Sequence, residues 1–171
     1  NVEAVATGLV RGAFEYQGQK CSAASRAYIP KSIWNDVKNV MESQLKTIKM
    51  GSPEDPSNFV NAVIDKNSFE KCKGYIERAE KSTDAEIIFG GKCDDSKGWF
   101  VEPTVILTTN PKYESVCEEI FGPILSIYVY EDQDWTETLK LVDETSPYSL
   151  TGAVFAQDRY AIAEAYKALE N

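Results

Sequence analysis

Ile124-Leu-Ser-Ile-Tyr-Val-Tyr130 is the stretch of sequence that decides the fold. Its nearly unbroken run of apolar and aromatic residues is typical of a buried β-strand. The pattern Asp134-x-x-Glu137 follows and predicts the capped start of a helix. Leu150 to Ala156 then predicts another strand. A strand, a helix and a strand in this order indicate a βαβ unit with a right-handed crossover, so we predict the α/β class.

Strands and helices alternate in the rest of the chain as well. The predicted helices are Val2–Tyr16, closed by Gln17-Gly18; a helix capped by Ser32; a helix after Ser68; a short helix opened by the capping box Ser115-x-x-Glu118; and a last helix from Asp158 to Asn171. The other predicted strands are Ser25–Ile29, Glu86–Phe89 and the extended segment Trp99–Leu107, which Pro103 places at a sheet edge or outside a central ladder. We expect one domain with a mostly parallel sheet and flanking helices. No strand follows the last helix, so we expect the sheet to be incomplete at its C-terminal edge.

The composition excludes several classes of function. The 171 residues are 43% hydrophobic and 26% charged, which is typical of a soluble globular domain. Asp and Glu number 27 against 18 Lys and Arg, giving a net charge of −9 that disfavours nucleic acids and anionic membranes as partners. The sequence has no run of 18 apolar residues, so we expect no membrane span. It contains no histidine, which excludes a Ser-His-Asp triad and histidine-ligated zinc.

The four cysteines carry most of the remaining chemistry. Cys21, Cys72, Cys93 and Cys117 are widely spaced without a Cys-x-x-Cys pair, so we predict reduced thiols in an intracellular compartment and no metal site. Cys21 differs from the others because it lies in a small polar turn between a helix end and a strand. A nucleophilic thiol must be ionised, and no acidic residue close in sequence can serve as its base. From the sequence, Cys21 is therefore either a nucleophile or an inert loop residue.

A second candidate feature is Glu118-Glu-Ile-Phe-Gly-Pro123, which joins a predicted helix to the strongest strand. In one interpretation the two carboxylates are solvated and Phe121 belongs to the core. In the other, a carboxylate and an aromatic ring at a helix-to-strand corner bind a ribose hydroxyl and a flat ring. No glycine-rich phosphate loop accompanies them, since Gly90-Gly91 fits a turn and Asp94-Asp95 a solvated loop.

These two features together resemble the signatures of the aldehyde dehydrogenase superfamily. They are Gly18-Gln-Lys-Cys-Ser-Ala-Ala-Ser-Arg26 and Glu118-Glu-Ile-Phe-Gly-Pro123, about 100 residues apart. Further stretches are similar to the glutamate-semialdehyde dehydrogenase branch of that superfamily: Phe89-Gly-Gly-Lys-Cys-Asp-Asp-Ser96, Phe100-Val-Glu-Pro-Thr104 and Leu150-Thr-Gly-Ala-Val-Phe-Ala-Gln-Asp158. The resemblance covers the whole chain and implies an aldehyde-dehydrogenase-like catalytic domain.

The resemblance also implies roles for five residues. Cys21 is the expected nucleophile, attacking glutamate semialdehyde of proline catabolism to form a thiohemiacetal that becomes a thioester, with NAD as cofactor. Its backbone N–H is an expected oxyanion donor. Ser22 and, less directly, Lys20 are expected to bind the distal carboxylate of the substrate. Glu119 is expected to bind the nicotinamide ribose and Phe121 to pack near the nicotinamide.

Parts of the family's machinery have no counterpart in the sequence. In the family, a preceding Rossmann-type domain binds NAD and supplies a glutamate base and an asparagine, and a substrate-anchoring loop follows the segment that resembles this chain. We therefore expect residues 1–171 to be a fragment of the catalytic domain that is inactive alone. The first residues, Asn-Val-Glu, also suggest a start in mid-protein.

Assembly and location are inferred from the family alone. We expect a homo-oligomer, in the mitochondrial matrix if the source is eukaryotic and in the cytoplasm if it is bacterial. Two alternatives stay open: another aldehyde dehydrogenase whose substrate lacks the second carboxylate, or a non-catalytic α/β interaction module in which Cys21 is structural.

Overall fold

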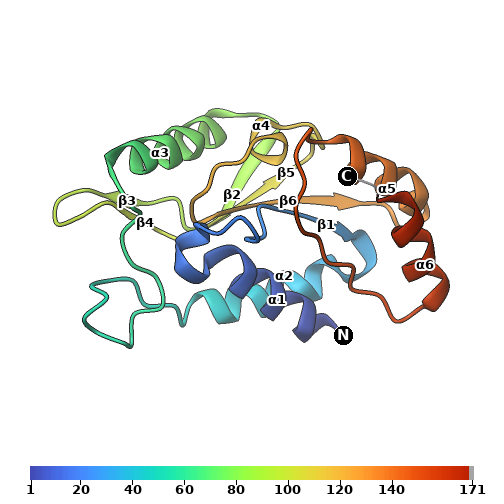
Figure 1. Ribbon diagram of the computed structural model, residues 1–171, viewed down its shortest axis with the longest axis horizontal. Coiled ribbons are helices and arrows are strands. Elements are labelled where there is room, and N and C mark those ends of the chain that lie inside the picture. Colours follow the sequence, from blue (N-terminus) through green and yellow to red (C-terminus); the bar gives the residue numbers. More distant parts are fainter. Residues whose placement is uncertain (170–171) are drawn as a thin grey trace.

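A four-stranded mixed sheet forms the centre of the computed structural model, which describes residues 1–169 (Figure 1). Its order is β1 (Arg26–Pro30), β6 (Ile124–Tyr130), β5 (Thr104–Thr108) and β2 (Ala85–Phe89). The central strand β6 pairs in parallel with both β1 and β5, and β2 runs antiparallel to β5. The α/β class and the mostly parallel sheet are thus confirmed. A separate two-stranded ribbon pairs β3 (Cys93–Asp94) with β4 (Phe100–Val101).

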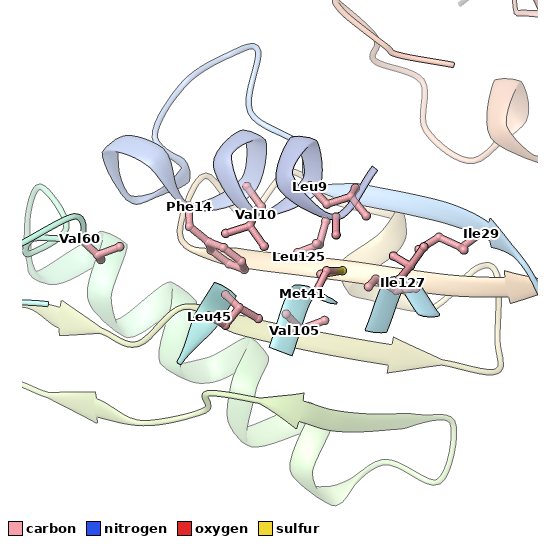
Figure 2. Close-up of a cluster of buried hydrophobic side chains, with 13 residues drawn as sticks. Leu9, Val10, Phe14, Ile29, Met41, Leu45, Val60, Val105, Leu125 and Ile127 are labelled. Carbon is pink, nitrogen blue, oxygen red and sulfur yellow. The ribbon is translucent and has the colours of Figure 1, made fainter. Parts of the chain in front are cut away.

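Helices cover both faces of the sheet. They are α1 (Val2–Phe14), α2 (Lys31–Leu45), α3 (Lys66–Lys81), α4 (Glu114–Cys117), α5 (Trp135–Glu144) and α6 (Arg159–Ala168). The apolar stripes of α1 and α2 pack on one face, where Leu125 and Ile127 are fully buried (Figure 2). Ile106 and Ile124 point to the other face and pack against α3. Alternate residues of β5 and β6 therefore serve two cores, which explains why β6 reads as a continuous apolar run.

The predicted strand at 150–156 is wrong. This segment has no ladder partner among residues 1–169 and most of its side chains are exposed, Leu150 by 70%. The parallel neighbours of β6 are β1 and β5, so the predicted βαβ crossover after β6 is wrong too. Instead α5 packs against α6, where Trp135 and Thr136 both donate hydrogen bonds to Glu164. An alternating pattern makes a strand only where a neighbouring strand supplies hydrogen bonds.

The position predicted from Pro103, at a sheet edge or outside a central ladder, is also wrong, because β5 lies between β6 and β2. Pro103 immediately precedes the strand, and the ladder begins at Thr104, whose N–H donates to the carbonyl of Pro123 at 2.9 Å. The missing N–H of proline therefore falls outside the ladder and costs no strand hydrogen bond.

Several predicted helix starts shift by a few residues. Tyr113 and not Ser115 is the N-cap of α4, and Ser115 is buried with its hydroxyl 2.7 Å from that of Ser126. The capping box is therefore wrong, since Glu118 lies beyond the helix. Pro30 takes the N-cap position predicted for Ser32.

The remaining predicted helix ends agree with the structure to different degrees. Asp134 occupies the N-cap of α5, although its side chain makes no capping bond. The helix α1 ends at Phe14 rather than Tyr16. Asp158 caps α6, whose described part ends at Ala168, while the predicted end at Asn171 lies outside the described residues.

Asp65, rather than Ser68, caps α3, and its carboxylate accepts the Ser68 N–H at 2.8 Å. We expect Asp65→Ala to lower the free energy of unfolding by about 1 kcal/mol, because a backbone donor loses its acceptor. Urea unfolding followed by circular dichroism measures this. The control Asp36→Ala removes an exposed carboxylate from the interior of α2 and should change stability by less than about 0.5 kcal/mol. Equal midpoints for the two variants would contradict the assignment.

Candidate active site

The turn that carries Cys21 follows a short left-handed segment. After α1 ends, Tyr16, Gln17 and Gly18 have positive φ angles of 54°, 58° and 65°. Such angles cost non-glycine residues about 1–2 kcal/mol each, so surrounding contacts must hold them. The chain then turns at Lys20–Ala23, where the Ala23 N–H donates to the Lys20 carbonyl at 3.0 Å. The chain therefore reverses its direction at Gln17-Gly18, where the sequence predicts only the end of a helix.

Two glutamine side chains hold this reversal. Gln17 is buried, accepts the Asn61 N–H at 3.1 Å and donates to the Ala62 carbonyl at 3.3 Å. Gln19 accepts the N–H of Ile64 at 2.9 Å. Sequence reasoning missed both residues as supports, because their partners lie about 45 residues away and the glutamines resemble ordinary loop residues.

Cys21 is the one exposed thiol among the four cysteines. Cys72 is buried, and burial raises the pKa of its thiol to about 11. Burial also raises the pKa of the half-buried Cys93 to about 11. Cys117 is half-buried at the end of α4. Accessibility thus separates Cys21 from the other three thiols, as the turn setting predicts.

Ser22 and Lys20 flank Cys21 and are both exposed. The Lys20 ammonium lies 3.2 Å from the Glu15 carboxylate, which also pairs with Arg11. The hydrogen bond and charge of Lys20 lower the pKa of Glu15, with a smaller effect from Arg11. Glu15 is therefore a poor proton acceptor for the thiol. Lys20 must release or share this partner to bind a second carboxylate.

The second candidate feature forms an exposed corner between α4 and β6. Phe121 has a positive φ of 61° and its side chain is 42% exposed. Glu119 is also exposed. The interpretation of Phe121 as a core residue is therefore wrong, since Ile120 and Gly122 are the buried members of the corner. A carboxylate and an aromatic ring are both available here to a ligand.

The two features meet at their glycines. A methyl group placed on Gly18 would overlap the carbonyl oxygen of Gly122 and lie 2.7 Å from that of Ala13. A methyl group placed on Gly122 would overlap the sulfur of Cys72 on α3. The turn before Cys21, the Phe121 corner and α3 are thus in direct contact. Only glycine permits such a close approach of two backbones, together with positive φ at position 18.

No group of three or more Cys, Asp or Glu side chains in residues 1–169 is arranged to hold a metal ion. Asp94, the last residue of β3, accepts the N–H of Ser96 at 2.9 Å and is exposed. None of the helices described is both long and apolar enough to cross a membrane.

Comparison with known proteins gives concordant matches. The family model described as Aldehyde dehydrogenase family matches residues 1–171. The Delta-1-pyrroline-5-carboxylate dehydrogenase, mitochondrial, of Dictyostelium discoideum is 60% identical over 171 residues, which are 100% of this chain and 31% of that protein. The protein of the same name from Homo sapiens is 50% identical over 172 residues, again 100% of this chain and 31% of that protein.

A solved structure agrees with these sequences. The Delta-pyrroline-5-carboxylate dehydrogenase from Mycobacterium tuberculosis bound with NAD has a TM-score of 0.91 and 41% sequence identity, covering 99% of this chain and 30% of that chain. The chain thus spans a little under a third of the length of these relatives.

Proposed function

The chain belongs to the aldehyde dehydrogenase family, and from this we propose that it is the cysteine-bearing part of an NAD-dependent enzyme that oxidises L-glutamate 5-semialdehyde to L-glutamate. The relatives named Delta-1-pyrroline-5-carboxylate dehydrogenase, one of them 60% identical, support this choice of substrate. Delta-1-pyrroline-5-carboxylate is the cyclic form of glutamate semialdehyde. The observation that carries the proposal is the exposed thiol of Cys21, which follows a turn whose Gly18 packs against Gly122 of the Phe121 corner.

Cys21 performs the covalent chemistry in this proposal. Its thiolate attacks the aldehyde carbon, a C–S bond forms, and the carbonyl electrons move to oxygen to give a thiohemiacetal. The Cys21 N–H donates one hydrogen bond to that oxygen. The C–H bond then breaks as the C=O bond re-forms, giving a thioester, and the hydride with its electron pair would pass to the nicotinamide ring that NAD supplies when bound. Water adds to the thioester, the C–S bond breaks, and glutamate and the free thiol result.

Ser22 and Lys20 bind the distal carboxylate of the substrate in this assignment. The Ser22 hydroxyl is exposed next to the nucleophile and can donate a hydrogen bond. Lys20 supplies positive charge to the substrate once its ammonium contacts the substrate carboxylate as well as Glu15. The Lys20 and Glu15 side chains are both partly exposed, so Lys20 can move to make this contact. Together they distinguish a substrate with a second carboxylate from a simple aldehyde.

Glu119 and Phe121 fit the nicotinamide end of NAD, which accepts the hydride when bound. The exposed Glu119 carboxylate can accept hydrogen bonds from ribose hydroxyls, and the exposed face of Phe121 can shelve a flat ring. Residues 1–169 contain no glycine-rich turn between a strand and a helix N-terminus for the pyrophosphate. We therefore assign the Rossmann-type NAD domain, the glutamate base and the asparagine oxyanion donor to polypeptide outside this catalytic segment.

Activity of the complete enzyme tests the proposal. NADH formation from glutamate semialdehyde should exceed that from aliphatic aldehydes, and Cys21→Ala should reduce it by at least about a thousandfold, because no other thiol reaches the substrate. The 171-residue chain alone should form no NADH above its own Cys21→Ala control. Preference for aliphatic aldehydes would indicate a different aldehyde dehydrogenase. Full turnover by Cys21→Ala would indicate a structural cysteine and a non-catalytic module.

Assembly and location follow from the same proposal. We propose that the complete enzyme is a homo-oligomer, which sedimentation equilibrium measures. The eukaryotic relatives are named mitochondrial, so a eukaryotic source implies the mitochondrial matrix and a bacterial source the cytoplasm.

A further inference from the structure

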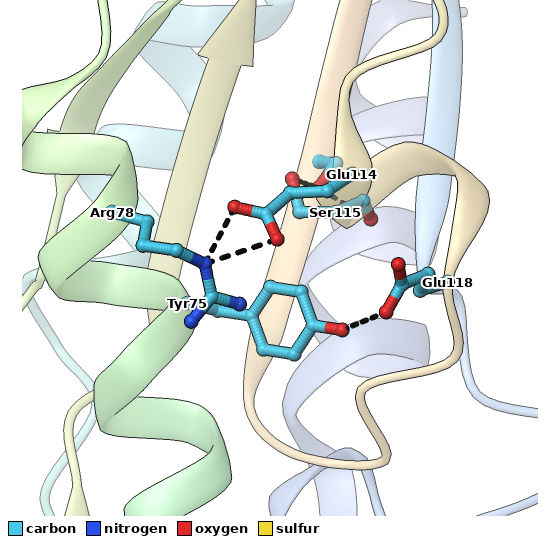
Figure 3. A network of polar contacts seen from close by, with 6 residues as sticks. Tyr75, Arg78, Glu114, Ser115 and Glu118 are labelled. Atoms are coloured by element: carbon cyan, nitrogen blue, oxygen red, sulfur yellow. Dashed lines mark hydrogen bonds and ion pairs between the residues drawn. The ribbon is translucent and has the colours of Figure 1, made fainter.

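One face of α3 contacts the segment that leads to the Phe121 corner. Residues 71, 75 and 78 are spaced at helical intervals of four and three, so their side chains project from the same face. The Lys71 ammonium donates to the Glu119 carbonyl at 2.8 Å. Tyr75 donates its hydroxyl to the Glu118 carboxylate, and Arg78 binds Glu114 (Figure 3). The helix thus meets this segment at several points along its length.

Tyr75 is the central contact in this set. Its ring is buried in the core beneath the segment, and its hydroxyl reaches out to Glu118, whose side chain is exposed. Burial and the bond to Glu118 raise the pKa of Tyr75 to about 12, so the phenol remains a donor at all physiological pH values. Glu118 directly precedes Glu119, the residue assigned to the ribose.

Arg78 closes the contact on the other side of Tyr75. Its guanidinium lies 4.5 Å from the centre of the Tyr75 ring, and its Nε is 2.8 Å and 3.0 Å from the two oxygens of Glu114. Figure 3 shows the Tyr75 ring between the Arg78–Glu114 pair and Glu118. The orientation of the phenol is therefore fixed from both sides, which a single exposed hydrogen bond would not achieve.

We propose that Tyr75, held by Arg78, is a positioning residue that fixes the conformation of the Phe121 corner, residues 118–122. It thereby sets the affinity of this corner for the nicotinamide end of the cofactor. This inference rests on the proposed function for its second half only. The hydroxyl donates its hydrogen bond to Glu118, the residue next to Glu119, so it acts through Glu118. The close packing of Gly122 against Cys72 of α3 fixes the far end of the same corner.

Two measurements test the two halves separately. In the 171-residue chain, Tyr75→Phe should accelerate amide exchange at Glu118 and Ile124, whose N–H groups bond to Glu114 and Gly122 on either side of the corner. In the complete enzyme, the KM for NAD should rise about fivefold to tenfold while kcat changes less than twofold, since a bond to a charged group is lost without contact to the reacting atoms.

Tyr28→Phe is the matched control, because it removes another partly buried phenol bond, 3.0 Å long to Thr145, at β1. It should leave the KM for NAD unchanged. Glu118→Gln retains an acceptor and should stay near wild type, whereas Glu118→Ala should reproduce Tyr75→Phe. Unchanged exchange at Glu118 and Ile124 in Tyr75→Phe, or an equal rise in KM in Tyr28→Phe, would overturn the proposal. A complete enzyme without NAD-dependent activity would refute the proposed function instead, and the exchange measurement would still decide the positioning role.

Discussion

Cys21 should react with iodoacetamide at least about a hundredfold faster than Cys72 or Cys93 at neutral pH. Alkylation requires the thiolate, and a thiol whose pKa is about 11, as for Cys72 and Cys93, is ionised in only about one molecule in three thousand at pH 7.5. Cys72 is in addition closed off beneath Gly122, whereas Cys21 is exposed. Cys117 should be slower through its partial burial.

Timed labelling followed by peptide mass mapping measures the four rates. The same chain in concentrated guanidinium chloride is the control, because unfolding removes the burial that distinguishes the thiols and should bring the rates within about tenfold of one another. The complete enzyme should show the same order. Equal labelling of all four thiols in the folded protein would contradict the site described here.

Gly18→Ala should lower the free energy of unfolding by about 3 kcal/mol and the melting temperature by roughly 6–12 °C. Two effects add. The substitution gives a side chain to a residue with φ of 65°, and it introduces a methyl group that overlaps the Gly122 carbonyl and lies 2.7 Å from that of Ala13. Both obstacles are backbone atoms, which cannot rotate away as a flexible side chain would. Relief requires separating the Cys21 turn from the Phe121 corner.

Gly152→Ala is the matched control, since no heavy atom lies within 4 Å of a methyl group placed there. It should change the melting temperature by no more than about 2 °C. Differential scanning calorimetry measures both variants. If Gly18→Ala melts together with Gly152→Ala, the two backbones are not in contact. Loss of Cys21 labelling selectivity in Gly18→Ala alone would support the contact independently.

The aldehyde-dehydrogenase-like fold could be predicted because its decisive signals are local or are carried by sequence motifs. The run at 124–130 is buried on both faces of the sheet and therefore reads as a strand without further information. The segment 150–156 reads almost as clearly, yet it stays unpaired in residues 1–169 because pairing depends on a neighbour that periodicity does not reveal. Pro103 led to a wrong prediction for β5. It lacks an N–H, but it lies directly before β5 begins, so the strand loses no ladder hydrogen bond.

The candidate site residues could be named from the sequence, but the residues that hold their segments in place could not. Cys21 and Phe121 belong to recognisable stretches, and their exposure agrees with availability to a ligand. Gln17 and Tyr75 bind partners about 45 residues away, so nothing in their neighbourhood marks them. The consecutive positive φ angles at Tyr16 and Gln17 were equally hidden, because neither residue type favours that conformation.

The meeting of Gly18 and Gly122 also orders events during protein synthesis. Cys21 leaves the ribosome about 100 residues before the corner that completes its surroundings, and long-range contacts of this kind form late because closing a long loop is entropically costly. A nascent chain that ends before β6 would contain Cys21 but lack the Phe121 corner that packs against its turn. Formation of the complete surroundings of Cys21 is thereby tied to completion of the central strand.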